Sequence, residues 1–449
     1  MITSPDDKPG TFPPSSNFRR FTPEVAHLLR RIDTALVRVE TADLWPSSAE
    51  ALRFSAQVGT IHYSTLIEGN RLGLLEAARA ARGQLDAKTK AEIELVNYVD
   101  ALRAIDERME TDGLAFNEDL FKSMHYEATK GLGAPTGPFK AHHEGDWRDG
   151  EAGVWDPVEG AFVHTGSPQA EVRPRMLGLI GWIASVEARP VDWPVAVIAG
   201  VVHYNVAEIH PFADGNGRTA RLLTAAMLTR HGMTPGRMFN FDAYYGKDKD
   251  AYLDALRSVR RETRNHETWM RYFLAGLAGE YERVSQEITR LSAIGRTKRG
   301  GRVQLTETQE RALTDLAIQN RVEFDREDYE IAAGVRRSSA AESLSRLVEA
   351  QVVVPVGEGR ARRYRLATAS GGGRRAERAS GAVRDWTDER IAKDLRALAG
   401  DGTRFPSVKQ FDDAGRRDLY NAISRHGGST LWAERLGLEP PRRGRPPRA

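Results

Sequence analysis

A short glycine-containing segment in the middle of the chain constrains the fold more than any other feature. Residues 210–221 read His-Pro-Phe-Ala-Asp-Gly-Asn-Gly-Arg-Thr-Ala-Arg, between an apolar stretch that ends at Ile209 and a periodic stretch from Arg218 to Arg230. Both flanking stretches have the apolar spacing of helices. The pattern Asp-Gly-Asn-Gly is typical of a tight turn, because glycine adopts backbone conformations that other residues avoid. The sequence therefore predicts two helices joined by a concave turn.

This turn has the chemistry of a phosphate-binding site. Successive backbone N–H groups at Gly215, Asn216 and Gly217, together with the positive end of the second helix, favour a bound anion. Arg218 and Arg221 are three residues apart and therefore lie on one face of that helix. Two permanently charged guanidinium groups beside such a turn suit a di- or triphosphate better than a single carboxylate.

Two further residues give the segment a reactive side. Asp214 offers hard oxygen ligands beside the expected phosphates, which suits Mg²⁺. His210 precedes the turn, where its imidazole is placed to accept a proton from an attacking hydroxyl group. The segment is neither a Walker A loop nor a Rossmann fingerprint, since it lacks the Gly-Lys-Ser/Thr ending and a preceding strand. A glycine turn with incidental charges explains any one of these residues but not the whole set.

The string 210–221 resembles the signature of the Fic family, His-x-Phe-x-Asp/Glu-Gly-Asn-Gly-Arg-x-x-Arg, at every defined position. The resemblance implies a mainly α fold, with an all-helical core and a β-hairpin called the flap. It also implies an enzyme that transfers AMP from ATP to Ser, Thr or Tyr hydroxyl groups of proteins, with His210 as general base and Asp214 as the Mg²⁺ ligand. The implied ATP-binding residues are Asp214, Gly215, Asn216, Gly217, Arg218, Thr219, Ala220 and Arg221, with Arg218 on the β-phosphate and Arg221 on the γ-phosphate. Tyr252 lies near the position of the family's adenine-contacting tyrosines.

An upstream segment resembles the family's inhibitory helix, Ser/Thr-x-x-x-Glu-Gly/Asn. It runs Ser64-Thr65-Leu66-Ile67-Glu68-Gly69-Asn70. The resemblance implies that Glu68 pairs with Arg221 and occupies the place of a γ-phosphate oxygen, with Ser64 as the first residue of the motif. Taken alone, the segment also fits ordinary capping of a helix by glycine. Its position ahead of the core implies the class with an N-terminal inhibitory helix.

Two weaker resemblances concern the flap. Gly137-Pro138-Phe139-Lys140 lies where the family has Gly-x-Tyr/Phe-Arg, ahead of the hairpin. We expect the hairpin itself within residues 150–165, where short extended pieces alternate with Gly, Pro and Asp. The resemblance implies that the flap holds a segment of the target protein by strand addition.

The composition divides the chain into several regions. There is no cysteine, which excludes disulfides, thiol nucleophiles and thiolate metal sites. The apolar stretches are too short for a membrane span and the N-terminus lacks a signal-peptide pattern, so we expect a soluble cytoplasmic protein that does not contact a membrane. The expected regions are a disordered 1–20, a helical 21–115 with the inhibitory motif, the Fic core 116–294, a basic linker 295–303, a winged-helix-like 304–368, a Gly/Arg linker 369–383, a small helical module 384–440 and a tail 441–449.

The C-terminal regions predict a second partner. Helices at 306–319, 326–333 and 338–349 followed by a hairpin have the order of a winged helix, with 338–349 as the recognition helix. The arginines that would contact DNA are Arg336, Arg337, Arg346, Arg360, Arg362, Arg363 and Arg365. The tail contains Arg-Gly-Arg-Pro, which resembles an AT-hook core, and it follows a module similar to small DNA-binding helical repeats. These features favour DNA contact through 304–449, although a winged helix that binds only protein has the same pattern.

Together these features predict an autoinhibited protein adenylyltransferase that uses ATP and Mg²⁺ and modifies a target protein, with itself as one candidate target. A homo-oligomer is a further possibility for this class. Two alternatives stay open at this level. The same core supports other reactions, including removal of AMP and transfer of another nucleotide, phosphocholine or phosphate. A DNA-binding regulator whose core only senses a nucleotide has the same motifs.

Overall fold

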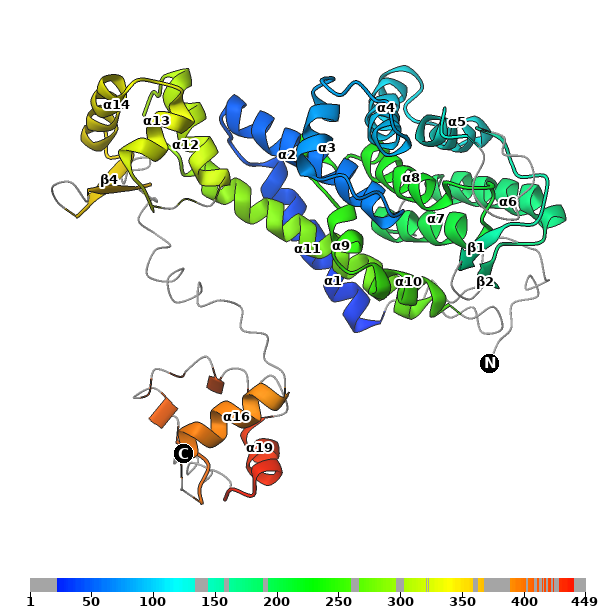
Figure 1. The fold of residues 1–449 in the computed structure, drawn as a ribbon. Helices are drawn as coiled ribbons and strands as arrows, with labels where there is room; N and C mark the ends of the chain where they lie inside the picture. The colour runs from blue at the N-terminus through cyan, green and yellow to red at the C-terminus, as the bar shows by residue number, and fades with distance from the viewer. Residues whose placement is uncertain are drawn as a thin grey trace. The chain divides into compact units, whose positions relative to one another are not determined.

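The chain is mainly helical, as predicted, and forms two compact units, Met1–Ala369 and Ser370–Ala449. The computed structural model describes residues 22–133, 144–156, 161–188, 193–259, 266–295, 303–319, 321, 323–357, 362–366, 388–400, 403–407, 410, 411, 414, 416, 419, 420, 423 and 428–439. The arrangement of the helices in the first unit is shown in Figure 1. The helices on either side of the turn, the three helices of the 303–366 region and the hairpin at 153–165 fall close to the ranges expected from the sequence, whereas the short helices Leu74–Ala81, Pro235–Arg237 and Asp242–Lys247 were not expected.

The elements of the first unit follow one another in this order: α1 (Pro23–Glu40), α2 (Pro46–Ile67), α3 (Leu74–Ala81), α4 (Lys90–Thr111), α5 (Glu118–Thr129), β1 (Gly153–Asp156), β2 (Ala161–Thr165), α6 (Gln169–Glu187), α7 (Val195–Ile209), α8 (Asn216–Arg230), the short η2 (Pro235–Arg237), α9 (Asp242–Lys247), α10 (Lys249–Arg257), α11 (Glu267–Ser292), α12 (Glu307–Ile318), β3 (Glu323–Phe324), α13 (Arg326–Ala333), α14 (Arg337–Glu349), β4 (Val353–Val356) and β5 (Arg363–Leu366).

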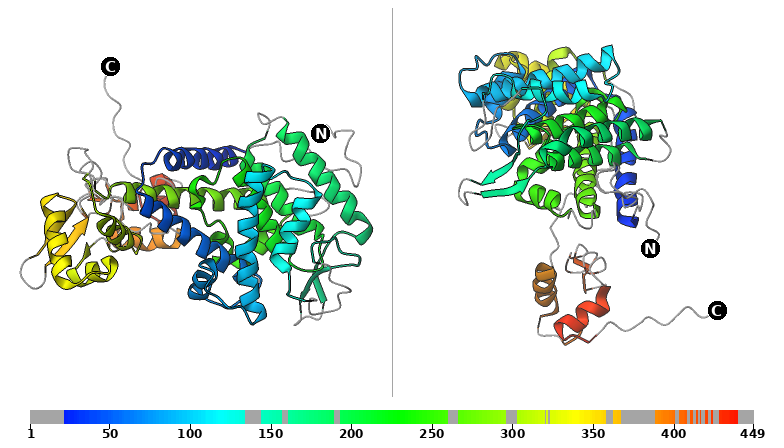
Figure 2. Two further views of the ribbon diagram at one scale, coloured as in Figure 1. Left: turned by 90° about the horizontal axis from the view of Figure 1, so that it is seen from above. Right: turned by 90° about the vertical axis from the view of Figure 1, so that its right-hand side faces the viewer.

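Helices α7 and α8 form the centre of the core, which Figure 2 shows from two further sides. The sequence of α7 is apolar on all sides, and a helix with that pattern is stable only when it is enclosed by other elements. Side chains are accordingly buried around its whole circumference, against α6, α8 and α11. Helix α8 is similarly enclosed, although two of its three arginines, Arg218 and Arg221, are among the buried side chains. The turn between the two helices is therefore held by the most buried part of the protein.

Helix α2 contacts two distant parts of the first unit. Near its N-terminal end, the Ser48 hydroxyl lies 2.7 Å from the Thr314 hydroxyl of α12, and Ser47 Oγ donates to Glu310 Oε1 at 2.5 Å. At its C-terminal end, Ser64 contacts α8. The two ends of one continuous helix thus touch the 303–366 region and the core.

The strands form two small sheets. Strands β1 and β2 pair antiparallel, with an irregularity in register between Val154 and Trp155, where the sequence predicts a hairpin. The second sheet has the order β3-β5-β4; in the chain, β3 lies between α12 and α13, and β4 and β5 follow α14. The sequence predicts two of its strands; the two-residue β3 was missed because so short a strand has no periodicity to detect.

The second unit has a small core of its own. Helices α16 (Asp388–Ala399) and α19 (Gly428–Leu436) contact each other. Its fully or nearly fully buried side chains are Ile391, Leu395, Phe405, Phe411, Leu419, Ile423, Trp432 and Ala433. Phe405, Phe411 and Trp432 belong to this cluster, and Tyr420 packs against it.

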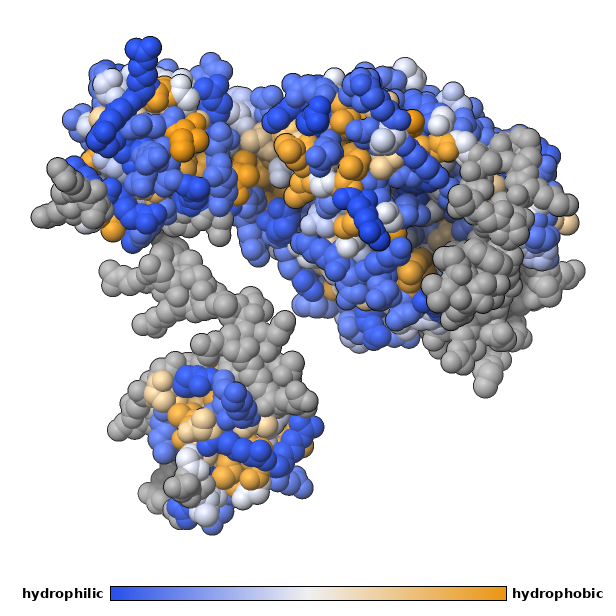
Figure 3. Space-filling view, in the orientation of Figure 1, coloured by the Kyte–Doolittle hydropathy of each residue, from blue (hydrophilic) through white to orange (hydrophobic). Residues whose placement is uncertain are grey.

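The surface of the described residues is mostly hydrophilic on the face that Figure 3 shows, with apolar side chains scattered among charged ones. Leu74 and Leu75 of α3 are among the exposed large apolar residues. Within the described ranges, none of the helices is both long and apolar enough to cross a lipid bilayer.

The hydroxyl pair between α2 and α12 generates a stability prediction. Thr314→Val leaves the Ser48 hydroxyl buried without its partner, so we expect the free energy of unfolding of the first unit to fall by about 2 kcal/mol. Urea unfolding followed by tryptophan fluorescence measures this change. The double variant Ser48→Ala/Thr314→Val should lose less than Thr314→Val alone, because neither polar group then lacks a partner. The exposed Ser345→Ala serves as control and should change the free energy of unfolding very little. A loss in Thr314→Val no larger than that of the control would contradict the prediction.

Candidate active site

The candidate site is built on the turn between α7 and α8. Helix α7 ends at Ile209, and His210 follows with φ 55° and ψ 58°, a left-handed conformation that is uncommon for residues other than glycine. Gly215, with φ 75°, precedes the first residue of α8. These two left-handed positions turn the chain out of one helix and into the next. Conformations of this kind persist where the surroundings hold them, and they concentrate at functional sites.

The turn is closed by its own side chains. Asn216 Oδ1 accepts the backbone N–H of Phe212 at 2.9 Å, and Asn216 Nδ2 donates to the Phe212 carbonyl at 2.8 Å. The Phe212 ring is fully buried and anchors the loop in the core. The side chain of Asn216 therefore shapes the turn, and its backbone N–H is the group left for an anion.

Helix α5 supports the turn from a second side. His125 Nδ1 accepts the N–H of Gly145 at 2.9 Å, so the proton of the neutral ring lies on Nε2, which donates to the Asp214 carbonyl at 3.0 Å. The same ring stacks on Phe212 with 3.8 Å between centroids, and the Trp147 ring lies 5.0 Å from Phe212. The backbone of the turn is thus fixed between α5 and the segment that follows residue 144.

Arg148 ties the turn to the base of the β1–β2 hairpin. Its side chain is buried, and its Nε donates to the His210 carbonyl at 2.8 Å. The other two nitrogens donate to the carbonyls of Gly150, at 2.5 Å, and Ser167. Burial lowers the pKa of this guanidinium, but the group remains charged because the ordinary pKa of an arginine is far above neutral pH. Both ends of the hairpin are therefore fastened to the residue that carries the imidazole.

The hairpin and His210 also approach each other closely. A Cβ placed on Gly166, just after β2, would lie 2.8 Å from Cβ of His210 and 3.1 Å from the Ile209 carbonyl. No larger residue fits there without movement of the backbone. The absence of a side chain at Gly166 is what allows the hairpin to lie beside the imidazole.

Arg221 is fully buried and is held by the C-terminal end of α2. Its Nε donates to Ser64 Oγ at 2.7 Å, and its Nη2 donates to the Ser64 carbonyl at 2.9 Å and to Glu68 Oε1 at 2.7 Å. The structure thus brings together the residues that the sequence pairs across a long separation, Glu68 and Arg221. Ser64 contributes two acceptors to the same guanidinium.

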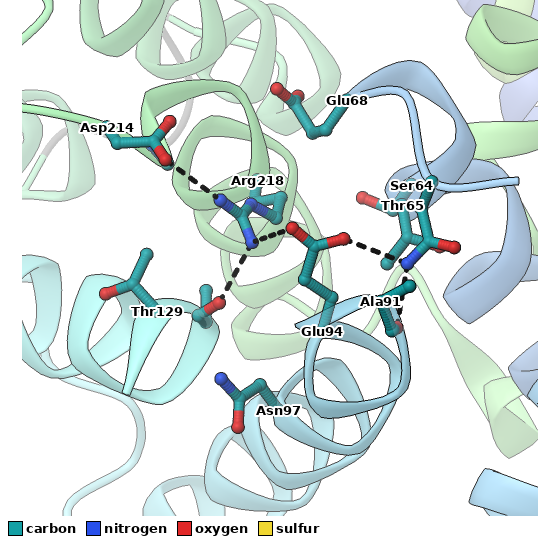
Figure 4. A network of polar contacts seen from close by, with 12 residues as sticks. Ser64, Thr65, Glu68, Ala91, Glu94, Asn97, Thr129, Asp214 and Arg218 are labelled. Atoms are coloured by element: carbon teal, nitrogen blue, oxygen red, sulfur yellow. Dashed lines mark hydrogen bonds and ion pairs between the residues drawn. The ribbon is translucent and has the colours of Figure 1, made fainter. Parts of the chain in front are cut away.

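Arg218 lies beside this pair, in the network drawn in Figure 4. Its Nη1 is 3.3 Å from the Ala128 carbonyl and 3.7 Å from Oε1 of Glu94 on α4. Its Nη2 is 3.8 Å from Oδ2 of Asp214. The side chain of Arg218 is nearly inaccessible to solvent. Both arginines of the motif therefore face carboxylates in this structure.

Two buried guanidinium nitrogens among the described residues have no hydrogen-bond partner, Arg218 Nε and Arg221 Nη1. A Cβ placed on Gly217 would lie 3.2 Å from Arg221 Nη1 and 2.4 Å from Oε1 of Glu68. One of these donors thus adjoins the glycine turn, at the place where Glu68 now lies. Buried donors without partners are rare in folded proteins and call for a ligand or water. Oxygen atoms of a phosphate chain fit them.

The charges at this pair shift each other's titration. Desolvation raises the pKa of Glu68, but the charges of Arg221 and Arg218 and the hydrogen bond from Arg221 outweigh it, so the pKa falls below its ordinary value. Desolvation lowers the pKa of Arg221, but Glu68 together with the smaller contributions of Tyr252, Asp242 and Tyr98 outweighs it, so this pKa is raised. The carboxylate therefore stays ionised, and the ion pair persists, across the whole neutral range.

Tyr252, which the sequence places near the adenine, is almost fully buried in a cluster of aromatic rings. Its hydroxyl lies 2.8 Å from His203 Nε2, and burial raises its pKa to about 12. Burial, and then the charge of Arg221, lower the pKa of His203 to about 3, so its ring is neutral. The Tyr252 hydroxyl is thus already bonded within the core, and a contact with adenine stays a prediction.

The donor set at Asp214 fits a Mg²⁺ ion that arrives with a nucleotide. Its Oδ1 accepts the Gly215 N–H at 2.7 Å, and its side chain is 42 % exposed. The described part of the chain contains no group of three or more acidic or histidine side chains arranged to hold a metal. Mg²⁺ commonly takes one or two protein carboxylates and completes its shell with phosphate oxygens and water. A single exposed carboxylate beside a phosphate site meets that requirement.

The remaining predicted positions divide into two groups. Thr219 and Ala220 are buried, and Thr219 Oγ1 donates to the Gly215 carbonyl at 2.9 Å, so their side chains face away from solvent. The segment Gly137-Pro138-Phe139-Lys140 and residues 157–160 of the expected flap lie outside the described residues.

Sequence reasoning missed several residues that the structure places around the turn: Asn70, Glu94, His125, Gly145, Trp147, Arg148 and Gly166. A signal was present for some of them. Gly145-Asp146-Trp147-Arg148 has the spacing Gly-x-aromatic-Arg, closer to the expected Gly-x-Tyr/Phe-Arg than the segment at 137–140 is. For His125, Asn70 and Glu94 no local pattern exists, since their contacts depend on helix packing.

The contacts of Arg148 predict a marked local effect of its removal. Arg148→Met takes a charged donor from three carbonyls, one of them in a fully buried hydrogen bond, so we expect a loss of about 3 kcal/mol in stability and faster amide exchange at residues 209–215. Hydrogen exchange measured by mass spectrometry tests this. Arg173→Met, which removes an exposed arginine 3.7 Å from Glu118, should change neither quantity appreciably. Equal exchange in the two variants would show that Arg148 does not hold the turn.

Comparison with known proteins shows that the region containing this site is similar to one protein family. Residues 115–228 match the model of the Fic/DOC family. The chain is similar to a protein named protein adenylyltransferase Fic from Culex quinquefasciatus, with 30% identity over 241 residues, which are 49% of this chain and 42% of that protein. A protein of the same name from Aedes aegypti is 28% identical over 197 residues, 40% of this chain and 34% of that protein. The chain thus spans less than half the length of these relatives.

A solved structure supports the fold over a longer range. A Fic family protein from Desulfovibrio desulfuricans G20 superimposes with a TM-score of 0.53 and 21% identity, covering 79% of this chain and 98% of that one. The matched family range 115–228 contains α5, the β1–β2 hairpin, α6, α7 and most of α8, including the whole turn. This chain therefore carries a Fic/DOC domain, and the turn at residues 210–221 lies within it.

Proposed function

We propose that this protein is a protein adenylyltransferase, which transfers AMP from ATP to a hydroxyl group of a target protein. The observation that carries the proposal is the pair of buried motif arginines, each with a nitrogen that has no partner among the described residues, beside a glycine turn and a histidine. The adenylyltransferase names of the similar proteins support the same reaction. Other Fic-type reactions remain as the alternatives to be excluded by experiment.

The residues have distinct roles in this reaction. The target's hydroxyl oxygen attacks the α-phosphorus, the bond from that phosphorus to pyrophosphate breaks, and His210 takes the hydroxyl proton. The N–H groups of the turn and Arg218 hold the phosphates and stabilise the charge that develops on the leaving oxygens. Mg²⁺, when bound at Asp214, supplies positive charge to the phosphate chain. The hairpin beside His210 is where we expect the target segment to be held.

We further propose that the protein is autoinhibited by Glu68. A carboxylate oxygen 2.7 Å from Arg221 Nη2, over the glycine turn, occupies the position that a γ-phosphate oxygen would need. Because the pKa of Glu68 is lowered, weak acid does not neutralise it and release the arginine. In this proposal ATP with a correctly placed γ-phosphate binds only when Glu68 moves away.

The 303–366 region supports a second proposal, that the protein also binds DNA. The chain order α12-β3-α13-α14-β4-β5, with a sheet of order β3-β5-β4, is that of a winged helix. Arg336 and Arg337 are exposed at the N-terminal end of α14, where a recognition helix contacts DNA. Arg346 is exposed but paired with Glu342 at 2.6 Å, and Arg365 is paired with Glu323. Arg360 and the tail 441–449 lie outside the described residues.

The proposal includes a cytoplasmic location, the possibility of a homo-oligomer, and a target protein with an accessible hydroxyl group. A nucleotide-sensing DNA-binding regulator is the alternative class. It differs from the enzyme in one respect, since it predicts nucleotide binding without covalent transfer.

The enzyme proposal predicts opposite effects for two substitutions. Glu68→Gly should raise AMP incorporation from labelled ATP by roughly 10- to 100-fold, because Arg221 is then available to the nucleotide. His210→Ala in the same background should abolish it. Mass spectrometry of the labelled protein identifies the adduct as AMP or another group. Glu50→Gly, an exposed position on the same helix α2, should leave incorporation at its basal level, and equal labelling of all forms would refute the proposal.

The DNA proposal predicts a salt-dependent interaction. Arg336→Gln/Arg337→Gln should weaken binding of duplex DNA by the full chain and reduce the slope of log affinity against log salt concentration by about two. Fluorescence anisotropy with a labelled duplex measures both. Arg30→Gln/Arg38→Gln makes the same change in net charge at exposed positions of α1. Binding reduced equally by both pairs would point to nonspecific attraction and not to a recognition helix.

A further inference from the structure

Glu94, on helix α4, lies between the inhibitory segment and the first arginine of the motif (Figure 4). One of its carboxylate oxygens faces Arg218 and the other accepts a hydrogen bond from Asn70, two residues after Glu68. We propose that Glu94 is a second carboxylate that restrains the nucleotide site. In this arrangement Glu94 opposes phosphate binding at Arg218 as Glu68 does at Arg221. The inference rests on the proposed nucleotide site.

The contact with Arg218 is electrostatic and protected from solvent. Glu94 Oε1 is 3.7 Å from Arg218 Nη1, and the two side chains are 13 % and 3 % exposed. On the other side of the same guanidinium, Asp214 Oδ2 is 3.8 Å from Nη2. Neither distance is that of a close hydrogen bond, so the carboxylates reduce the positive potential of Arg218 without fixing it tightly. At such depth charges are screened far less than at the surface.

Asn70 connects Glu94 to the segment that carries Glu68. Its Nδ2 donates to Glu94 Oε2 at 2.9 Å and to the Ala91 carbonyl at 2.8 Å. Its backbone N–H donates to the Thr65 carbonyl at 3.1 Å, within the last turn of α2. The Asn70 side chain is buried, so these bonds replace water contacts. The end of the inhibitory helix is therefore fastened to α4 through the same carboxylate that faces Arg218.

The balance of charge in the site explains why loss of the Glu94 charge should strengthen phosphate binding. Two arginines, Arg218 and Arg221, face three carboxylates, those of Glu68, Glu94 and Asp214. Such a site carries net negative charge before any ligand arrives, and it therefore opposes a polyphosphate. Loss of one carboxylate makes the site more favourable for an anion, because like charges repel over these distances. A role of Glu94 in orienting Arg218 for the phosphate predicts the opposite effect.

Two substitutions separate the functions of this carboxylate. Glu94→Gln removes the charge but keeps the shape and an amide oxygen able to accept from Asn70. Asn70→Ala keeps the negative charge of Glu94 opposite Arg218, but it removes the hydrogen bond that connects Glu94 to the inhibitory segment. Glu107→Gln, an exposed position on the same helix, is the matched control for Glu94→Gln. Glu94→Ala provides a second charge-removing variant if the glutamine form does not fold, which its thermal unfolding shows.

Calorimetric titration of the full-length variants with ADP and Mg²⁺ tests the inference directly, without reference to catalysis. We expect Glu94→Gln to lower the dissociation constant by roughly fivefold, both in the natural sequence and in the Glu68→Gly background. Asn70→Ala should leave the dissociation constant for ADP unchanged, because its action runs through Glu68, which opposes the γ-phosphate that ADP lacks. In titrations with ATP and Mg²⁺, Asn70→Ala should lower the dissociation constant in the natural sequence and have no effect once Glu68 is absent. Glu107→Gln should leave it unchanged.

The possible failures are distinguishable. If Glu68→Gly binds ADP and Glu94→Gln weakens binding or matches Glu107→Gln, the role of Glu94 is wrong and the proposed nucleotide site stands. If no variant, including Glu68→Gly, binds ADP or ATP, the proposed function itself fails. Tighter binding in Glu94→Gln with unchanged Glu107→Gln supports the second restraint.

Discussion

The buried guanidinium of Arg221 is the constraint on which the site depends. A charge with no access to solvent is stable in a folded protein only when partners compensate it. Here the partners come from the end of α2, where Ser64 offers two acceptors and Glu68 a carboxylate. All three bonds join α2 and its C-cap to α8. The position of α2 therefore determines which groups contact Arg221 in the candidate site. A nucleotide that replaced Glu68 would have to supply the negative charge that the arginine then lacks.

The turn itself is held independently of that ion pair. Asn216 closes it from within, His125 supports its backbone, and Arg148 fastens the His210 carbonyl to the hairpin. These bonds involve carbonyl and amide groups that do not take part in the proposed chemistry. In the proposed function, the imidazole and the N–H groups of the turn would therefore keep their positions when the arginines exchange a carboxylate for a phosphate. Glu68 could then inhibit without distorting the base.

Features that depend on residues close together in the sequence could be predicted, whereas contacts that depend on helix packing could not. Most of the helices and the turn at Gly215 were predictable, because periodicity and turn chemistry are local features of the sequence. The Glu68–Arg221 pair was expected only from the resemblance of two separate segments to the Fic family. Arg148 was predictable in principle from the spacing Gly-x-aromatic-Arg at 145–148, but a similar segment at 137–140 obscured it. Glu94 and His125 were not, because a single glutamate or histidine on an amphipathic helix looks like any other until packing places it. The strand β3 was missed for a comparable reason, since two residues gain their structure only from pairing with β5.

Helix α2 contacts both the 303–366 region and the helical core of the first unit. Trp45, just ahead of it, donates to the Ile294 carbonyl at 3.0 Å, and Ser48 contacts Thr314 of α12, while Ser64 at the other end holds Arg221. A continuous helix transmits a displacement of one end to the other, because its backbone hydrogen bonds resist local deformation. Binding energies at two sites that bias the same element are coupled reciprocally. Under the proposed function, a ligand of the 303–366 region that shifted α12 against α2 would change the affinity for nucleotide, and the nucleotide would change the affinity for that ligand by the same factor.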